Sequence, residues 1–424
     1  MADIVVKGGR VIDATGERMA DVAIEGNNIV AVGEGLTALR VLDAGGCVVA
    51  PGFVDIHTHL REPGTEDAET IESGSRAAVL GGYTAVVAMP NTTPPIDDAS
   101  VVRDVLALGR DALCDVHTSA AITVGRAGDR LAPMAEMAEL GVHLFTDDGD
   151  GVQDPGVMRN ALEYAAGLGV TLAQHCEVDS LSLDGQMNEG EWSSRLGMPG
   201  IPAEAEELMV MRDIALARMT GARVHFQHLS TAGSVAMVRA ARQAGVPVSA
   251  EATTHHFTLT EAEVAGYDPV FKVNPPLRTV ADVGGVKLGL ADGSIDAIAT
   301  DHAPHTADAK NLPFDQAPPG MLGLETAFAL AVTELDLSIA EIIALLSWRP
   351  AAIAGIATEH GAPIAPGSPA NVTIFDPVTT WTVDPRELAS LSRNTPYAGR
   401  TLTGRVRHTI VAGEAVVIDG DAQR

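Results

Sequence analysis

Eight apolar runs of strand length recur along the middle of this chain, and amphipathic stretches with helical periodicity separate most of them. Continuous apolar runs are typical of strands in a parallel sheet that helices cover. Eight such units predict an α/β fold with a closed (β/α)8 TIM barrel rather than a doubly wound sheet. The predicted strands are Phe53–Ile56, Tyr83–Met89, Asp115–Ile122, Val142–Phe145, Thr171–Ala173, Val224–Phe226, Val246–Ala250 and Ala297–Ala299. The predicted helices include Glu66–Leu80, Pro155–Leu168, Glu204–Thr220 and Ala232–Ala244.

The two ends of the chain have a different pattern, in which short strand-like runs alternate with turn residues. At the N-terminus the runs are Asp3–Val6, Arg10–Asp13, Val22–Glu25 and Asn28–Val32, and at the C-terminus Ala370–Phe375, Val406–Val411 and Ala415–Ile418. Neither set is large enough to bury a face alone, so we expect them to complete one small β-sandwich together. The predicted domains are residues 1–52 with 360–424, and a barrel over 53–359.

Side chains that bind metals gather where the predicted barrel strands end. They occur in Asp55–His59, Asp147–Asp148, Gln174–Cys176, Gln227–Ser230 and Thr300–His302. Imidazole nitrogens and carboxylate oxygens are the ligands that a divalent metal such as zinc takes in hydrolytic sites. Ligands that arrive from the ends of successive strands meet at one mouth of a barrel. The pattern therefore predicts a metal-dependent hydrolase.

Each of these motifs is weak when it stands alone. His57 and His59 are two residues apart, so both point to one face of a strand, but 13 histidines in 424 residues give roughly 0.4 such pairs by chance. A lone His175 or His228 is more often an ordinary polar residue, and Asp301 could be a helix N-cap. The shared position at strand ends favours the metal site.

Composition excludes several classes of protein. The chain has 28 Lys and Arg against 56 Asp and Glu, a formal net charge of -28, which disfavours binding to nucleic acids or anionic membranes. Three scattered cysteines do not form a disulfide framework, and the N-terminus lacks the pattern of a signal peptide. No apolar run approaches the ~20 residues of a membrane span. We therefore expect a cytoplasmic protein. We also expect Cys176, next to His175, to be a small buried residue rather than a nucleophile or a ligand.

Several motifs, taken in order, resemble those of the dihydroorotases, in the cyclic-amidohydrolase branch of the amidohydrolase superfamily. The longest is Pro51-Gly52-Phe53-Val54-Asp55-Ile56-His57-Thr58-His59-Leu60-Arg61-Glu62-Pro63-Gly64. Further blocks are Met89–Thr92, Phe145–Gly149, Asn274–Arg278 and Ala299–His305. The resemblance covers essentially the whole chain and is greatest to the bacterial monofunctional type I enzymes.

The resemblance implies two zinc ions. His57, His59 and Asp301 would hold one ion, and His175 and His228 the other. Many relatives bridge the ions with a carboxylated lysine, but the only lysines are Lys7, Lys272, Lys287 and Lys310, none near a mid-barrel strand end. Asp148 matches the bridging aspartate of the type I enzymes. A site with one metal ion stays open.

The resemblance also implies a reaction and its substrate. Two divalent ions acidify a shared water and polarise a carbonyl, and Asp301 is the expected general base and acid. The reaction is the reversible cyclisation of N-carbamoyl-L-aspartate to L-dihydroorotate in pyrimidine synthesis. Arg61 would bind the substrate carboxylate. The other expected substrate contacts are Asn91, Asn274, His305, Pro319 and Gly320, the last two in a flexible loop over the mouth.

Two alternative functions remain open from the sequence. One is a dihydropyrimidinase, hydantoinase or allantoinase on the same scaffold, whose members usually carry the missing lysine and act on substrates without a carboxylate. Another is a non-catalytic partner of aspartate carbamoyltransferase, although such proteins lose metal ligands. An active enzyme could also form a homodimer or a complex with that transferase.

Overall fold

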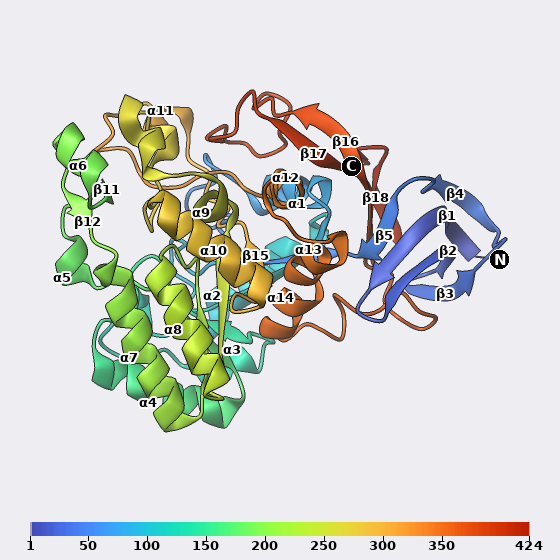
Figure 1. Cartoon of the computed structure of the whole chain (residues 1–424). Helices are drawn as coiled ribbons and strands as arrows, with labels where there is room; N and C mark the ends of the chain where they lie inside the picture. The colour runs from blue at the N-terminus through green and yellow to red at the C-terminus, as the bar shows by residue number, and fades with distance from the viewer. Residues whose placement is uncertain (1, 424) are drawn as a thin grey trace.

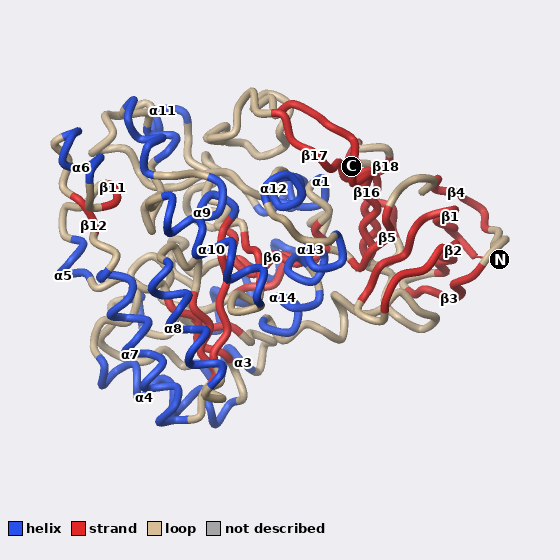
Figure 2. Tube along the Cα trace, in the orientation of Figure 1, coloured by secondary structure: helices blue, strands red, loops and turns tan. Residues whose placement is uncertain are grey.

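The computed structural model describes residues 2–423, and in it the middle of the chain is a closed barrel (Figures 1 and 2). Its strands are β6 (Phe53–Thr58), β7 (Tyr83–Ala88), β8 (Asp115–Thr118), β9 (Leu144–Phe145), β10 (Thr171–Gln174), β13 (Arg223–Phe226), β14 (Val248–Thr253) and β15 (Ala297–Ala299). They pair in parallel as β6-β7-β8 and as β9-β10-β13-β14-β15. Parallel bridges from Ala120 to Phe145 and from Thr58 to His302 close the ring. The predicted TIM barrel is confirmed.

Helices surround the barrel, and four long ones cover β9 to β15. The helices are α1 (Ile71–Leu80), α2 (Ala99–Leu108), α3 (Met134–Ala138), α4 (Pro155–Leu168), α5 (Asp179–Ser182), α6 (Glu191–Leu196), α7 (Glu204–Thr220), α8 (Ala232–Gln243), α9 (Thr254–Thr258), α10 (Val280–Asp292), α11 (Ala307–Lys310), α12 (Ala327–Glu334), α13 (Ile339–Leu346) and α14 (Trp348–Ile353). Figure 1 shows α4, α7, α8 and α10 side by side, which agrees with the contacts between successive pairs of them. Their apolar faces pack on the strands in the largest hydrophobic cluster.

Two predicted barrel elements have wrong ends. The first helix begins at Ile71 instead of Glu66, because Thr70 caps it and accepts a hydrogen bond from the amide of Ser73. The third strand ends at Thr118 instead of Ile122. Residues 119–122 are apolar and buried but lie in a loop, so their hydrophobicity reports burial and not strand geometry.

The N- and C-terminal segments form one nine-stranded sheet, as expected from their shared pattern (Figure 2, red, at the right). Its strands are β1 (Ala2–Asp13), β2 (Gly16–Glu25), β3 (Asn28–Gly33), β4 (Ala38–Asp43), β5 (Val48–Pro51), β16 (Val372–Thr382), β17 (Thr401–Val411), β18 (Glu414–Ile418) and β19 (Asp421–Ala422). A separate hydrophobic cluster contains residues of both segments, for example Val22, Val49 and Ile374. β5 joins them, because it pairs with β1 on one side and with β16 on the other.

The sheet differs from the predicted strands in two details. Asp3–Val6 and Arg10–Asp13 belong to one long strand, β1, whose register shifts between Val6 and Gly9. The glycines there suggested a turn, but they form a bulge, a common role of glycine inside strands. The pairing is also mixed, because β1 runs antiparallel to β2 but parallel to β4 and β5.

No helix among residues 2–423 is long and apolar enough to cross a membrane.

A two-stranded sheet of β11 (Met187–Asn188) and β12 (Gly200–Ile201) lies beside α5 and α6 at the mouth end of the barrel (Figure 1).

Candidate metal centre and active site

Six of the predicted site residues converge at the carboxyl ends of the barrel strands. His57 lies near the end of β6 and His59 directly after it, while His175, His228 and Asp301 follow β10, β13 and β15. Asp148 follows β9. All six side chains are buried. The structure thus brings together residues from five strands that are up to 244 positions apart in the sequence.

His57, His59 and Asp301 form the first group of potential ligands. Asp301 Oδ1 lies 2.9 Å from His59 Nε2 and 3.6 Å from His57 Nε2. Burial alone would raise the pKa of Asp301, but its hydrogen bond with His59 and the nearby His57 hold that pKa well below the usual range. This carboxyl group is therefore kept charged, as a metal ligand must be.

Asp148 lies between the two pairs of histidines. Its Oδ1 is 3.3 Å from His57 Nε2, 3.8 Å from His228 Nε2 and 3.9 Å from His175 Nδ1, and its Oδ2 is 3.6 Å from His59 Nε2. A second potential ligand group contains Asp148 and His228, together with His57 rather than His175. One carboxylate that faces both histidine pairs has the position required of a bridging ligand.

The donor atoms at this centre fit divalent cations. His57 Nε2 and Asp148 Oδ1 are fully buried and have no hydrogen-bond partner. His175 Nδ1 and His228 Nε2 point at each other across 2.9 Å. Unpaired buried polar atoms are costly, and a cation among these atoms would satisfy all four.

Two contacts outside the centre fix which nitrogen of each histidine faces inward. His57 Nδ1 lies 2.7 Å from Glu251 Oε1, and His59 Nδ1 lies 2.9 Å from Asn91 Oδ1. Because these oxygens accept hydrogen bonds, each Nδ1 carries the proton and each Nε2 keeps its lone pair for the centre. Asn91, predicted to contact substrate, therefore also orients His59.

Glu251 is a residue that the sequence analysis missed. It is buried within β14, two residues before the strand ends, bonds both His57 and His225, and its pKa is held at about 2 against the effect of burial by those two histidines. The signal available in the sequence was an acidic residue directly after the predicted strand Val246–Ala250. His255, four residues further on, is also buried near the centre, and burial lowers its pKa to about 4.

A cavity of about 190 Å³ opens above the centre and contains every predicted site residue except His57, which lies beneath it. Its lining is His59, Arg61, Asn91, Asp148, Gly149, His175, His228, Val273, Asn274, Asp301, Ala303, His305, Pro318, Pro319 and Gly320. No lysine is among the described residues that line it. Three non-glycine residues of the lining, Arg61, His228 and Asp301, have positive φ angles (63°, 33° and 46°). Such backbone strain is typical of functional sites.

The predicted substrate contacts lie around this cavity. The Arg61 Nε–H donates to the carbonyl oxygen of Pro304 at 3.1 Å, and His305 Nε2 donates to the carbonyl oxygen of Pro319 at 2.8 Å. Burial and the adjacent Arg61 lower the pKa of His305 to about 3, so its ring is neutral. Asn274 Nδ2 lies 3.5 Å from His175 Nε2, and its Oδ1 is buried without a partner.

The segment 306–323 lies over the mouth, as predicted, and includes α11. Its Lys310 Nζ donates to the carbonyl oxygens of Pro318 and Gly320, both at 3.0 Å. Lys272 binds the same segment by donating to the carbonyl oxygen of Phe314 at 2.8 Å. Two of the four lysines therefore hold the loop, and its predicted flexibility stays a prediction.

Three other residues have structural contacts. Asp55 accepts hydrogen bonds from the amide and hydroxyl of Thr300 and so ties β6 to the end of β15. Asp147 likewise accepts from the amides of Ile122 and Thr123. Cys176 is buried with a free thiol, as expected of a small core residue.

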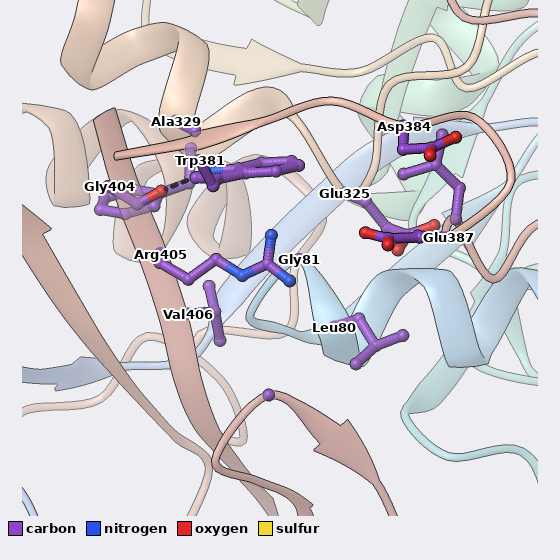
Figure 3. A pocket seen from close by; sticks show the side chains of 13 residues that line it. Leu80, Gly81, Glu325, Ala329, Trp381, Asp384, Glu387, Gly404, Arg405 and Val406 are labelled. Atoms are coloured by element: carbon purple, nitrogen blue, oxygen red, sulfur yellow. Dashed lines mark hydrogen bonds between the residues drawn. The ribbon is translucent and has the colours of Figure 1, made fainter. Parts of the chain in front are cut away.

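A second pocket, the seam pocket, lies between the barrel and the terminal sheet and is lined by residues of α12 and β17, among others (Figure 3). It encloses about 80 Å³. Arg405 lies over the Trp381 ring at 4.4 Å, and Glu325, Asp384 and Glu387 gather nearby. None of its lining residues within 2–423 is a histidine or cysteine, so it lacks the donor set of the mouth.

Comparison with known proteins agrees with this site. A family model described as "Dihydro-orotase-like" matches residues 46–234. Proteins named dihydroorotase are 47% identical in Pelotomaculum thermopropionicum (98% of this chain, 99% of the relative) and 48% identical in Streptomyces coelicolor (99% of each). The chain belongs to the dihydroorotase family. A dihydroorotase of Mycobacterium tuberculosis is 46% identical over 96% of both chains.

Solved structures show the same fold in related enzymes. An L-hydantoinase from Arthrobacter aurescens superposes with a TM-score of 0.90 at 23% identity, over 100% of this chain and 98% of its own. A D-hydantoinase from Thermus sp. has a TM-score of 0.85 at 26% identity, over 99% and 96%. This chain thus shares its overall fold, barrel and terminal sheet included, with proteins named hydantoinase.

Proposed function

We propose that this protein is a dihydroorotase that catalyses the reversible, zinc-dependent conversion of N-carbamoyl-L-aspartate to L-dihydroorotate. The observation that carries the proposal is the convergence of four histidines and two aspartates at the barrel mouth, in a chain 46–48% identical to dihydroorotases over nearly its full length. The reaction breaks or forms a cyclic amide C–N bond.

The proposed metal ligands are the six converging side chains, with Asp148 shared between two ions. Divalent ions held there would acidify a water and polarise the ring carbonyl. Zinc suits this mixture of imidazole and carboxylate ligands, and two overlapping donor groups that share His57, together with His175 beside Asp148, support two ions per chain. Metal analysis of protein purified without chelator tests both points.

Asp301 is the proposed general base and acid. It is charged, buried and next to the point where the ligand atoms meet, so it can accept the proton of the attacking water and deliver it to the ring nitrogen that leaves. In the direction of cyclisation, the same carboxylate removes the proton from the ureido nitrogen before the ring closes.

Arg61 is the proposed ligand of the substrate carboxylate. Its Nε bonds the carbonyl of Pro304 and one terminal nitrogen lies 3.3 Å from His305, which positions the guanidinium at the cavity wall. Asn91, Asn274, His305 and the backbone of Pro319 and Gly320 would supply hydrogen bonds to the ring and ureido groups. A guanidinium that binds a carboxylate in two places gives both affinity and orientation.

The second candidate is a hydantoinase or dihydropyrimidinase activity, since solved structures with those names share the fold. Two observations disfavour it: the cavity contains an arginine suited to a carboxylate, and its described lining has no lysine. Rates with dihydroorotate, dihydrouracil, hydantoin and allantoin on the metal-loaded protein decide between them. Negligible turnover of dihydroorotate alongside turnover of another ring would refute our proposal.

Two proposals about partners are supported by the family resemblance alone. The chain would act as a homodimer or in a complex with aspartate carbamoyltransferase, which supplies N-carbamoyl-aspartate. Sedimentation of the protein alone and mixed with that transferase tests both.

A further inference from the structure

A second group of metal-binding side chains lies at the floor of the barrel, away from the mouth. His117 is on β8, and Glu359 and His360 are in the segment that follows α14. One ligand atom from each of the three lies within 4.8 Å of the others. The group is near the amino-terminal ends of the strands, because Asp115 begins β8 and contacts His360. A cavity of about 310 Å³ adjoins it, lined in part by His117 and Glu359.

His117 has a donor atom that nothing in the protein satisfies. Its Nε2 is buried and has no hydrogen-bond partner. The ring stands perpendicular to that of His360, at 89°, with centroids 6.0 Å apart. An unpaired buried nitrogen costs about 1–3 kcal/mol, so such an atom calls for an explanation. Two imidazoles at this separation can share one ion.

His360 can supply a lone pair to the same point without losing a proton. Its Nδ1 lies 3.1 Å from Thr84 Oγ1, and its Nε2 lies 2.8 Å from Asp115 Oδ2. Without a cation, Nε2 carries the proton and donates it to Asp115. When a cation binds Nε2, the proton moves to Nδ1 and is donated to Thr84, and Asp115 is left free to face the cation.

We propose that His117 Nε2, His360 Nε2 and the carboxylate of Glu359 form a binding site for one divalent transition metal ion, separate from the mouth. Two imidazoles and a carboxylate suit Zn²⁺, Co²⁺ or Ni²⁺, and Asp115 or a water completes a tetrahedron. Ligands about 2.0–2.2 Å from zinc lie roughly 3.4 Å apart. Glu359 is exposed, so its side chain can move in to close the remaining gap.

An ion at this site would stabilise the floor of the barrel. It would connect β8 to the segment that leads from α14 into β16 of the terminal sheet. The backbone carbonyl of Glu359 already accepts a hydrogen bond from Asn371 Nδ2 at 2.9 Å, next to the start of β16. The ion would therefore link barrel and sheet, a structural role that does not depend on the reaction at the mouth.

The test is to count metal ions on the whole protein and its variants. Wild type, Glu359→Gln and His117→Gln are each stripped, loaded with excess Co²⁺, separated from free metal and analysed by mass spectrometry. His143→Gln is the matched control, because His143 lines the same cavity but lies outside the ligand group. We expect wild type and His143→Gln to bind one more ion per chain than the other two variants.

Two further readouts separate this proposal from loss of folding or of activity. Glu359→Gln should keep wild-type turnover of dihydroorotate, because Glu359 is far from the mouth and exposed. Added Co²⁺ should raise the melting temperature of mouth-loaded wild type and fail to do so for Glu359→Gln. Equal metal counts in all four proteins, or an equal loss in His143→Gln, would refute the floor site whatever the activity at the mouth.

Discussion

Buried carboxyl groups behave in opposite ways at the barrel mouth and in the seam pocket. At the mouth, Asp301 and Asp148 are surrounded by histidines, which hold the pKa of each well below its usual range although burial opposes this. In the seam pocket, burial raises the pKa of Glu325 to about 7, and the backbone amide of Ala389 is its main compensation. A buried carboxyl group is thus fully charged at the mouth and only partly charged near neutral pH in the seam pocket.

The difference shows what distinguishes a functional centre from an ordinary cavity in this molecule. Burying a charge is costly unless partners compensate it, and the mouth supplies histidine partners from the ends of three strands, β6, β10 and β13. The seam pocket has acidic groups and only one arginine among its described lining residues. This residue is Arg405, and its guanidinium lies over the ring of Trp381. Several buried histidines keep the carboxylates of the mouth charged, and such an arrangement of side chains is suited to binding cations.

The largest expected effect is that of Asp301→Asn, which removes the charge of the proposed base and keeps its shape. Turnover should fall about 10²–10⁴-fold in both directions, the usual contribution of a general acid and base. Initial rates with dihydroorotate and with carbamoyl-aspartate measure it. Asp150→Asn is the control, because Asp150 is exposed and pairs with Arg126 outside the cavity. Retention of more than a tenth of the rate would contradict the role.

Glu251→Gln tests whether the charge on an outer partner maintains the centre. Without the carboxylate, the orientation and basicity of His57 weaken, and we expect metal affinity or activity to fall about 10–100-fold. Competition with a metal chelator measures the affinity. Glu261→Gln removes another buried carboxylate, one that bonds Asn188, and should leave metal affinity unchanged. Equal effects of both variants would mean that Glu251 acts through stability alone.

Arg61→Ala tests whether the arginine at the mouth, unlike the arginine of the seam pocket, binds the carboxylate of the substrate. Loss of a charge-assisted pair, about 1.5–3 kcal/mol, corresponds to a 10–150-fold increase in the KM for dihydroorotate, with a smaller change in kcat. Arg126→Ala, which removes an arginine outside the cavity, is the control. An unchanged KM would show that another group binds the carboxylate.

The smallest effect on turnover is expected in the seam pocket, from Glu325→Gln, which changes the pH dependence of stability instead. Because the pKa of Glu325 is raised to about 7 in the folded state from 4.5, the folded protein holds its proton more tightly than the unfolded chain does. Wild type should therefore lose stability relative to the variant as pH rises from about 4.5 to 7, by about 2–3 kcal/mol. Denaturant unfolding at several pH values measures this. Glu387→Gln, an exposed carboxyl in the same pocket, is the control, and a parallel pH dependence of wild type and Glu325→Gln would contradict the prediction.

Much of the barrel could be predicted because each strand is an apolar run that ends in a polar residue. Phe53–Ile56 followed by His57 is such a case, and the position of the predicted strand end pointed to His57 as a proposed ligand. The rule failed at Asp115–Ile122, where apolar residues continue past the strand into a buried loop. Hydrophobicity follows burial, and burial does not stop where hydrogen-bonded pairing stops.

The contacts around the proposed ligands were harder to predict than the convergence of those residues at the mouth. Nothing in the sequence near Glu251 says that it will meet His57, 194 residues away, because that contact exists only after the barrel closes. The same is true of His117 and His360, which come from β8 and from the segment after α14. The parallel pairing of β1 with β5 was missed for a related reason: pairing direction depends on the path of the whole chain.

The position of β5 in the terminal sheet has a consequence for synthesis of the protein on the ribosome. One edge of β5 pairs with β1, which is made earlier, but the other waits for β16, which begins at Val372. At roughly 5–20 residues per second, the intervening 52–371 take about 16–64 s to emerge. During that time an unpaired strand edge is exposed to neighbouring nascent chains, so a chaperone that shields residues 48–51 would favour correct assembly.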